Sequence, residues 1–271
     1  MTLEISDTLL EKMRLDVLAT VLQSLGLGCL DAPIVSGSMG LQMMGGLYRL
    51  PNDIDCISPS GESVRQLEGV YQLTRDRTVE LKRLGAIPFN PGKRVIPGVS
   101  FIAIIANGRG QKIDKVLIDF QLHAEKYELA AADGAEGRFT GEVRLAPVEA
   151  ILADKCHALL RKRRDGRTNT RWMDLADLHC SMTSQTLQIR ADALTSWFDL
   201  AQRYLPVQDW VDHGDGPPRE WLGPWRKLQA VNITRDLPSL DDCWWSVRDF
   251  FDTRLDGTVW SATLGRWEAE C

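Results

Sequence analysis

Long hydrophobic runs are missing from this sequence of 271 residues, although 44% of the residues are hydrophobic. A helix needs about 20 consecutive apolar residues to cross a bilayer, and no stretch approaches that length. The first residues include the acids Glu4, Asp7 and Glu11, and they lack the basic region and apolar core of a secretory signal. We therefore expect a cytoplasmic protein that makes no contact with a membrane.

Cysteine is also scarce. The six cysteines are spread along the chain without a C-x-x-C pair or the dense spacing of a disulfide framework, so we expect reduced thiols. Cysteine and histidine, which bind zinc in proteins, are adjacent at Cys156-His157 and at His179-Cys180. Neighbouring residues on a helix point about 100° apart, which disfavours a zinc site built from these pairs.

Positive charge is not in excess, because 32 Lys and Arg stand against 37 Asp and Glu, a net charge of -5. Contact with nucleic acid would therefore need a local basic patch. One candidate lies between Lys155 and Arg171, where seven basic residues accompany one acid. Such a run is usually a solvated helix end. The alternative is a patch that follows the phosphates of RNA, with Arg161, Lys162, Arg163 and Arg164 as the RNA-binding residues.

The first 171 residues contain no tryptophan, and all nine tryptophans lie between Trp172 and Trp267. This contrast predicts two units with different cores, a first domain over residues 1–145 and a helical C-terminal domain over residues 146–271. Tryptophans of the second unit are interpreted as packing residues rather than as a platform for stacked bases.

Apolar periodicity predicts an α/β (α+β) first domain, a mixed sheet flanked by helices. A helix is expected over residues 4–25. Short β-branched or alternating segments predict strands at 33–35, 53–57, 99–106 and 115–121. Further helices are expected at 41–47 and 62–84. Pro147 begins a further helix, and the chain after it is expected to be mostly helical.

Gly37 and Ser38 lie where a short apolar strand turns into an expected helix. A turn of small residues presents backbone N–H groups and a hydroxyl to an anion, although Ser38 could equally be a simple helix cap. The same segment falls one residue short of the G-x-S-x-G elbow of acyl hydrolases, because Ser36 replaces the first glycine. A serine hydrolase with Ser38 as nucleophile is therefore a rival prediction.

Asp53 and Asp55 are two residues apart in an expected strand, so both point to one face. Two like charges side by side favour a divalent cation that neutralises them. If Val116, Ile118 and Phe120 face the core, Asp119 points the other way and a neighbouring strand could place it beside the pair. Asp114, on the same segment, is a competing third carboxylate.

The order of these features resembles the core of the nucleotidyltransferase superfamily with the DNA polymerase β-type fold; the matching positions are Gly37, Ser38, Arg49, Asp53, Asp55 and Asp119. Further along, Lys155 and the run from Asp174 to Leu178, Asp-x-x-Asp-Leu, are similar to signatures of the AbiEii-type toxins of toxin–antitoxin and phage-defence systems. The resemblance covers residues 33–178.

This resemblance implies a nucleotidyltransferase that uses Mg²⁺, two ions with NTP bound, to move a nucleotide from an NTP to an acceptor hydroxyl. It implies a tRNA 3′ end as one acceptor, together with a cognate antitoxin. A small-molecule hydroxyl remains an alternative acceptor. A catalytically silent binding module is a third class, against which the intact pair of acids argues.

The resemblance also implies roles for individual residues. Asp53, Asp55 and Asp119 would bind the metal and be catalytic. The nucleotide would be bound by Gly37, Ser38, Arg49 and Lys155. Lys155 would contact the triphosphate and Asp174 would seat the helical part, so both are counted among the catalytic residues.

Overall fold

The computed structural model describes residues 7–25, 33–46, 50–58, 64, 66–85, 98–121, 138–140, 143–161, 170–204, 216–231, 237–254 and 257–269. By packing, the chain divides into two compact units. Unit 1 comprises Met1–Gly40 and Leu50–Pro147, and unit 2 comprises Leu41–Arg49 and Val148–Cys271. The sequence-based division at residues 145 and 146 did not anticipate that Leu41–Arg49 packs with unit 2.

Unit 1 is built on an eight-stranded mixed sheet with the strand order β3-β4-β5-β6-β2-β1-β8-β7. β2 and β6 are parallel, as are β1 and β8, and the other neighbouring strands are antiparallel. The strands are β1 (Ile34–Ser36), β2 (Asp53–Ile57), β3 (Gly69–Thr74), β4 (Arg77–Gly85), β5 (Gly98–Asn107), β6 (Lys112–Gln121), β7 (Arg138–Thr140) and β8 (Val143–Leu145). This confirms the mixed sheet expected from the sequence.

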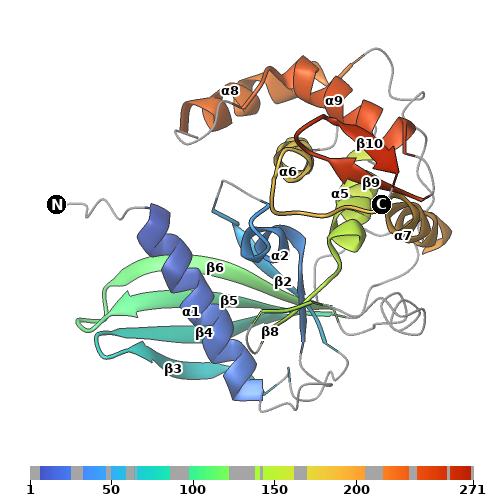
Figure 1. Ribbon diagram of the computed structural model, residues 1–271. Coiled ribbons are helices and arrows are strands. Elements are labelled where there is room, and N and C mark those ends of the chain that lie inside the picture. Colours follow the sequence, from blue (N-terminus) through green and yellow to red (C-terminus); the bar gives the residue numbers. More distant parts are fainter. Residues whose placement is uncertain are drawn as a thin grey trace. The chain divides into compact units, whose positions relative to one another are not determined.

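One face of the sheet carries the core of unit 1. Alternate residues of the central strands are buried there, among them Ile54, Ile118 and Phe120. Helix α1 (Asp7–Leu25) crosses strands β3 to β6 (Figure 1) and contributes the buried residues Met13 and Val17. Because side chains alternate along a strand, the residues between the buried ones point to the opposite face. The predicted inward direction of Val116, Ile118 and Phe120 is confirmed.

The helix predicted over residues 62–84 is wrong. Strands β3 and β4 occupy most of that stretch and pair as an antiparallel hairpin. The turn between them is marked by Asp76, whose carboxylate accepts a hydrogen bond of 2.8 Å from Thr74. Val79 and Leu81 alternate with more exposed neighbours, which is the period of a strand and not of a helix.

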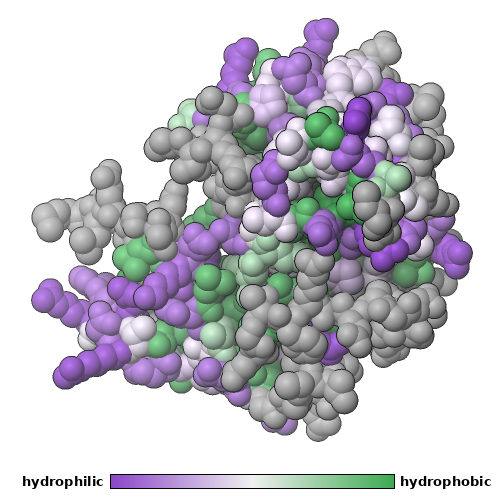
Figure 2. All heavy atoms as spheres, in the orientation of Figure 1, coloured by the Kyte–Doolittle hydropathy of each residue, from purple (hydrophilic) through white to green (hydrophobic). Residues whose placement is uncertain are grey.

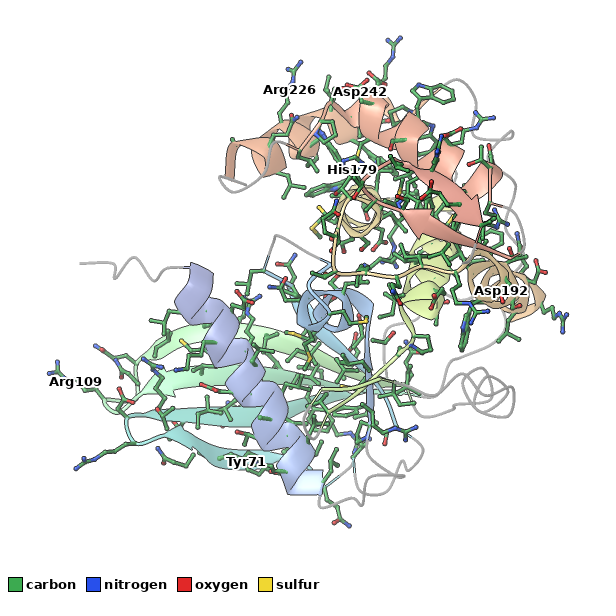
Figure 3. All side chains as sticks on the ribbon, in the orientation of Figure 1. Tyr71, Arg109, His179, Asp192, Arg226 and Asp242 are labelled. Carbon is green, nitrogen blue, oxygen red and sulfur yellow. The ribbon has the colours of Figure 1, made fainter. Side chains whose placement is uncertain are left out.

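The far ends of strands β5 and β6 meet in a turn of polar and small residues. Asn107 closes this turn, since its side chain accepts hydrogen bonds from the backbone of Arg109 and Gln111. This end of the sheet is mostly hydrophilic in Figure 2, and Arg109 points away from the strands in Figure 3. The turn thus holds two long strands in register at the end remote from Asp119.

Unit 2 is mainly helical, as expected; its helices are α5 (Val148–Leu160), α6 (Trp172–Met182), α7 (Ala191–Tyr204), a short 3₁₀ turn at Arg219–Trp221, α8 (Leu222–Val231) and α9 (Leu240–Asp252). Its core is aromatic and includes the buried tryptophans Trp197, Trp221, Trp225, Trp244 and Trp260. The prediction that tryptophans pack the second unit is confirmed for these five.

A small hairpin, β9 (Thr258–Ser261) with β10 (Arg266–Ala269), also belongs to unit 2 and was not predicted. The indole rings of Trp260 and Trp267 in this hairpin pack on the ring of Phe250, with ring centroids 4.7 Å and 4.9 Å from the Phe250 centroid. The indole N–H of Trp267 donates to the Phe250 carbonyl at 2.9 Å. Aromatic packing, rather than strand length, therefore holds the hairpin.

Candidate functional site

Three carboxylates of unit 1, those of Asp53, Asp55 and Asp119, share the face of the sheet opposite the core, and we call them the acid row. Asp55 on β2 is the register partner of Asp119 on β6, and Asp53 is paired with Leu117 on the same strand. Partners on neighbouring strands point to the same side and lie about 5 Å apart. The expectation that Asp119 stands beside the Asp53–Asp55 pair is therefore met by the register.

Polar side chains at matching register positions form a row across the four strands β1, β2, β6 and β5. Ser36 on β1 pairs with Asp55, and Asp119 pairs with Ser100 on β5. Both serines are buried. The two carboxylates are thus flanked by hydroxyl-bearing residues on the outer strands of the row.

Gly37 begins helix α2 (Gly37–Met43) directly beside Asp55. Its φ of 61° lies in the left-handed region that glycine tolerates best. A Cβ atom at this position would overlap Asp55 Oδ2 and lie 3.0 Å from Cγ. The turn therefore brings backbone against the carboxylate, and only glycine fits there.

The electrostatic setting of Asp119 differs from that of an ordinary surface carboxylate. Burial raises the pKa of Asp119 above its ordinary value, and the charge of Asp53 raises it further. The Ser100 hydroxyl, which donates to Asp119 Oδ1 at 2.5 Å, acts in the opposite direction. Burial and the nearby charge of Asp53 thus both disfavour the ionised form of Asp119.

Asp114, the competing third carboxylate, is engaged elsewhere. The guanidinium of Arg14 on α1 donates to it twice, at 2.9 and 3.3 Å. Arg14 also donates to the Pro51 carbonyl, so it links β6 to the segment that leads into Asp53. Asp119, and not Asp114, is the β6 acid that lies in register with Asp55.

Cys56, directly after Asp55 in sequence, faces the core and is fully buried. Burial raises the pKa of its thiol strongly, and the charges of Asp55 and Asp119 raise it further. A thiol in that setting stays protonated, so Cys56 acts as a small packing residue.

The donor set suits a hard divalent cation, because carboxylate oxygens are the ligands that Mg²⁺ prefers. Within the ranges described above, no three His, Cys, Asp or Glu side chains are gathered as a ready-made metal cluster. Mg²⁺ is commonly bound by one or two carboxylates together with substrate phosphates and water. The open row of acids fits that mode of binding and not a closed protein cage.

Lys155 in unit 2 lies between two carboxylates. Its ammonium group donates to Asp174 at 3.0 Å and to Asp177 at 2.8 Å. The lysine side chain is 8% exposed and that of Asp177 is 1% exposed. Both aspartates of the Asp-x-x-Asp-Leu run therefore hold the lysine that precedes them on α5.

Other residues singled out from the sequence fall into two groups. Ser38 is buried in α2, and Arg161 directly follows α5. Burial lowers the pKa of Arg161, and the nearby charge of Arg171 lowers it further, so two cations of the basic run lie near each other. The remaining residues lie outside the described part of the chain: Arg49, Lys162, Arg163 and Arg164.

Sequence reasoning missed three residues of these sites. Ser100 is the partner of Asp119, Arg14 ties the two acid-bearing strands together, and Asp177 shares Lys155 with Asp174. Only Asp177 had a sequence signal, since it completes the Asp-x-x-Asp spacing. His179, from the disfavoured zinc pairs, points into unit 2 (Figure 3), where burial lowers its pKa.

In the part of the chain that the structure describes, no helix combines the length and the apolar character that a membrane crossing requires. Comparison with curated proteins gives no match.

Two solved structures from Helicobacter pylori are similar to this chain. One, described as a candidate nucleotidyltransferase, shares 13% identity, covers 90% of this chain and 93% of its own, and superposes with a TM-score of 0.52. The other, the protein JHP933, shares 15% identity over 75% of this chain and 84% of its own, with a TM-score of 0.43. The first supports the nucleotidyltransferase fold.

The family comparison covers more than half of the sequence and includes the acid row of unit 1 and the lysine cluster of unit 2. Residues 31–221 match the family described as the nucleotidyl transferase AbiEii toxin of type IV toxin–antitoxin systems, and the chain belongs to this family.

Proposed function

We propose that the protein transfers a nucleotide from an NTP to an acceptor hydroxyl with the help of Mg²⁺, and that the acceptor is the 3′ end of a tRNA. Membership of the AbiEii family supports nucleotidyl transfer as the reaction class and favours it over acyl hydrolysis by Ser38. It also supports a cognate antitoxin as partner.

The observation that carries the proposal is the register of β2 and β6. It places Asp119 beside Asp55, with Asp53 one step along the same face. Burial, and to a smaller extent the charge of Asp53, raises the pKa of Asp119, so both disfavour its ionised form. A divalent cation removes that repulsion and at the same time binds the phosphates of an NTP.

In the proposed reaction the acceptor oxygen attacks the α-phosphorus of the NTP, and the bond to pyrophosphate breaks. Asp53, Asp55 and Asp119 would hold Mg²⁺, which supplies neutralisation of phosphate charge and activation of the attacking hydroxyl. Asp119 takes the proton of that hydroxyl and passes it to solvent. The pyrophosphate leaves with its charge balanced by cations, so positioning and electrostatics do most of the catalytic work.

Substrate binding is assigned to the small residues at the turn. Gly37 lets the backbone approach closely, and Ser38 offers a hydroxyl to the outer phosphates. The resemblance implies that Lys155 contacts the triphosphate; within unit 2, Asp174 and Asp177 fix its ammonium group. Arg49 is assigned to the nucleotide on the resemblance alone.

The direct test incubates the purified protein with total RNA and each labelled NTP, with and without Mg²⁺. The proposal expects label at the 3′ end of tRNA, only with Mg²⁺, and none with the Asp53→Asn variant. Label on a small molecule instead of RNA would support the alternative acceptor. No labelled product in any mixture, with the antitoxin absent, would refute nucleotidyl transfer. Labelling of Ser38 by a fluorophosphonate would favour the hydrolase.

We assign the basic run after α5 to the polynucleotide acceptor. The charges of Arg161 and Arg171 lie near each other, with the Asp174 carboxylate close to both. Each phosphate contact releases counterions, so the affinity for single-stranded RNA should fall with salt by about 0.7 log units per contact and decade. Replacing the four cations Arg161, Lys162, Arg163 and Arg164 by Gln should flatten this slope, whereas parallel slopes would identify a solvated helix end.

A further inference from the structure

Ser100 on β5 is hydrogen-bonded to a carboxylate of the acid row. Its hydroxyl donates to Asp119 Oδ1 at 2.5 Å. The side chain comes from β5, the strand adjacent to β6, at the register position directly opposite Asp119. Ser100 is 1% exposed, whereas Asp119 is half-buried. The hydroxyl thus lies beside the carboxylate on the neighbouring strand and is itself shielded from water.

The strength of this contact follows from its chemistry. A hydroxyl that donates to an ionised carboxylate at 2.5–2.7 Å makes a short, charge-assisted hydrogen bond, about twice as strong as a neutral one. Because Ser100 is buried within the paired strands β4, β5 and β6, its position is fixed by the sheet. The bond therefore restricts rotation of the Asp119 carboxyl group about its Cβ–Cγ bond.

We infer that Ser100 is a positioning residue for Asp119: by holding Oδ1 it leaves Oδ2 as the oxygen that meets the metal and the attacking hydroxyl. This inference rests on the proposed function, because it assigns a consequence to the orientation of a carboxylate in that site. Without Ser100 the carboxyl group can turn, and either oxygen or both can face Asp55 and the cation.

The role explains why a serine stands on an otherwise apolar strand. β5 reads Gly-Val-Ser-Phe-Ile-Ala-Ile-Ile-Ala-Asn, and Ser100 is its only side chain with a hydroxyl. Burying a hydroxyl without a partner is unfavourable, and Asp119 is the partner that satisfies it. A purely structural serine would need only some acceptor, whereas a positioning residue needs this carboxylate.

Two variants test the inference. Ser100→Ala removes the donor, and Ser100→Cys keeps a side chain of similar shape with a much weaker donor. The matched control is Ser58→Ala, since Ser58 is a completely buried serine just after β2, outside the polar row. Each protein is compared with wild type for kcat and KM in transfer and, without nucleotide, for Mn²⁺ binding by electron paramagnetic resonance.

Residues that orient metal ligands typically affect metal affinity or activity by about 10- to 100-fold. We expect both Ser100 variants to lose kcat by about that factor and to bind Mn²⁺ more weakly, with KM for NTP nearly unchanged. Ser58→Ala should match wild type in all three values. Wild-type kcat and Mn²⁺ affinity in both Ser100 variants would overturn the inference.

Asp119→Asn separates this inference from the proposed function. If Asp119→Asn is inactive while the Ser100 variants transfer normally, Ser100 does not position the carboxylate, and the proposed function stands. If Asp119→Asn transfers at the wild-type rate, the assignment of Asp119 in the proposed function fails. Mn²⁺ binding then still reports on Ser100, because that measurement does not require transfer.

Discussion

Both units bury aspartates, but the charges are balanced in opposite ways. In unit 2, Asp174 and Asp177 share the ammonium group of Lys155. In unit 1, burial raises the pKa of Asp119, the nearby charge of Asp53 raises it further, and the group that offsets this rise is the Ser100 hydroxyl. One cluster supplies its own counter-charge, and the other leaves carboxylates of like charge together.

This difference shows which cluster balances its charges with its own residues and which gains from a cation in solution. A buried ion pair that is complete needs nothing from outside, and its members resist replacement because each would leave the other uncompensated. Carboxylates that face each other gain from a cation supplied by the solution. We therefore expect substitutions in the acid row to reduce activity without loss of stability, and removal of the Lys155 ammonium group to reduce stability as well.

The largest effect is expected from the acid row. Asp53→Asn and Asp55→Asn should each reduce transfer by roughly a thousandfold or more, since the metal loses an oxygen ligand of the required charge. The thermal transition of the metal-free protein should stay equal or rise, because like-charge repulsion is relieved. Activity assays with Mg²⁺ and thermal melts in EDTA measure the two effects. Wild-type transfer by both variants would mean that the acids bind no catalytic metal.

Lys155→Met should lower stability, in contrast to the substitutions in the acid row. Removing the ammonium takes a buried counter-charge from Asp174, which keeps the exposed Arg171 at 3.4 Å, and from the nearly inaccessible Asp177. We expect this to reduce the free energy of unfolding by about 3–5 kcal/mol. Urea unfolding measures this. The control is Lys82→Met, because Lys82 pairs with Glu80 at 3.0 Å with side chains 51% and 43% exposed. An exposed pair contributes less than about 1 kcal/mol.

Neutralising the two partners sharpens the test. Adding Asp174→Asn and Asp177→Asn to Lys155→Met removes the uncompensated charges, so much of the lost stability should return. If Lys155→Met alone unfolds like wild type, the cluster of unit 2 is not structural and the contrast between the units disappears.

Gly37 tests the geometry of the acid row with a smaller expected effect. Gly37→Ala should reduce transfer by about a hundredfold, because the new methyl group displaces the Asp55 carboxylate and even a shift of about 1 Å is costly in catalysis. Gly110→Ala is the control. Gly110 has a similar φ of 74°, and nothing lies within 4 Å of the position of its Cβ.

Both alanines therefore carry the backbone strain of a positive φ, about 1 kcal/mol or more. Only the variant at position 37 also meets a carboxylate. Equal activity of the two variants would show that close approach of Gly37 to Asp55 has no part in transfer.

The sequence predicted the part of the acid row that depends on a single strand. Alternation within residues 53–57 and 115–121 placed Asp53 and Asp55 on one face and Asp119 on the face opposite the core. It left Asp114 as an alternative. That alternative was resolved only by Arg14, which lies 100 residues away in sequence and pairs with Asp114.

Contacts between side chains on neighbouring strands could not be predicted from the sequence either, because they depend on residues far apart in the chain. Ser100 meets Asp119 because β5 and β6 pair in one of several possible registers, and a shift of one residue would turn the serine to the other face. The helix predicted over 62–84 failed because apolar residues at mixed spacing were interpreted as a helix and the turn at Asp76 was overlooked. The β9–β10 hairpin is held by rings that contact Phe250 from a distance in sequence, which no local pattern reveals.

The smallest expected effect concerns the pH dependence of stability. The pKa of Asp119 is raised above its ordinary value of 3.8, first by burial and then by Asp53. The folded state therefore binds this proton more tightly than the unfolded state. The resulting stabilisation is complete below pH 3.8 and is lost as the pH rises through the folded pKa. Asp119→Asn removes this dependence, so in EDTA wild type should lose stability relative to the variant between pH 3 and pH 7.

Asp76 supplies a control of opposite sign. The hydrogen bond from Thr74 is the largest cause that lowers its pKa in the exposed β3–β4 turn. Its contribution to stability is therefore present above its ordinary pKa and lost as the pH falls through the folded value. Urea unfolding from pH 3 to pH 7 should give difference curves of opposite slope for Asp119→Asn and Asp76→Asn. A flat or equally directed curve for Asp119→Asn would mean that burial and the charge of Asp53 together do not raise the pKa of this carboxyl group in the folded protein.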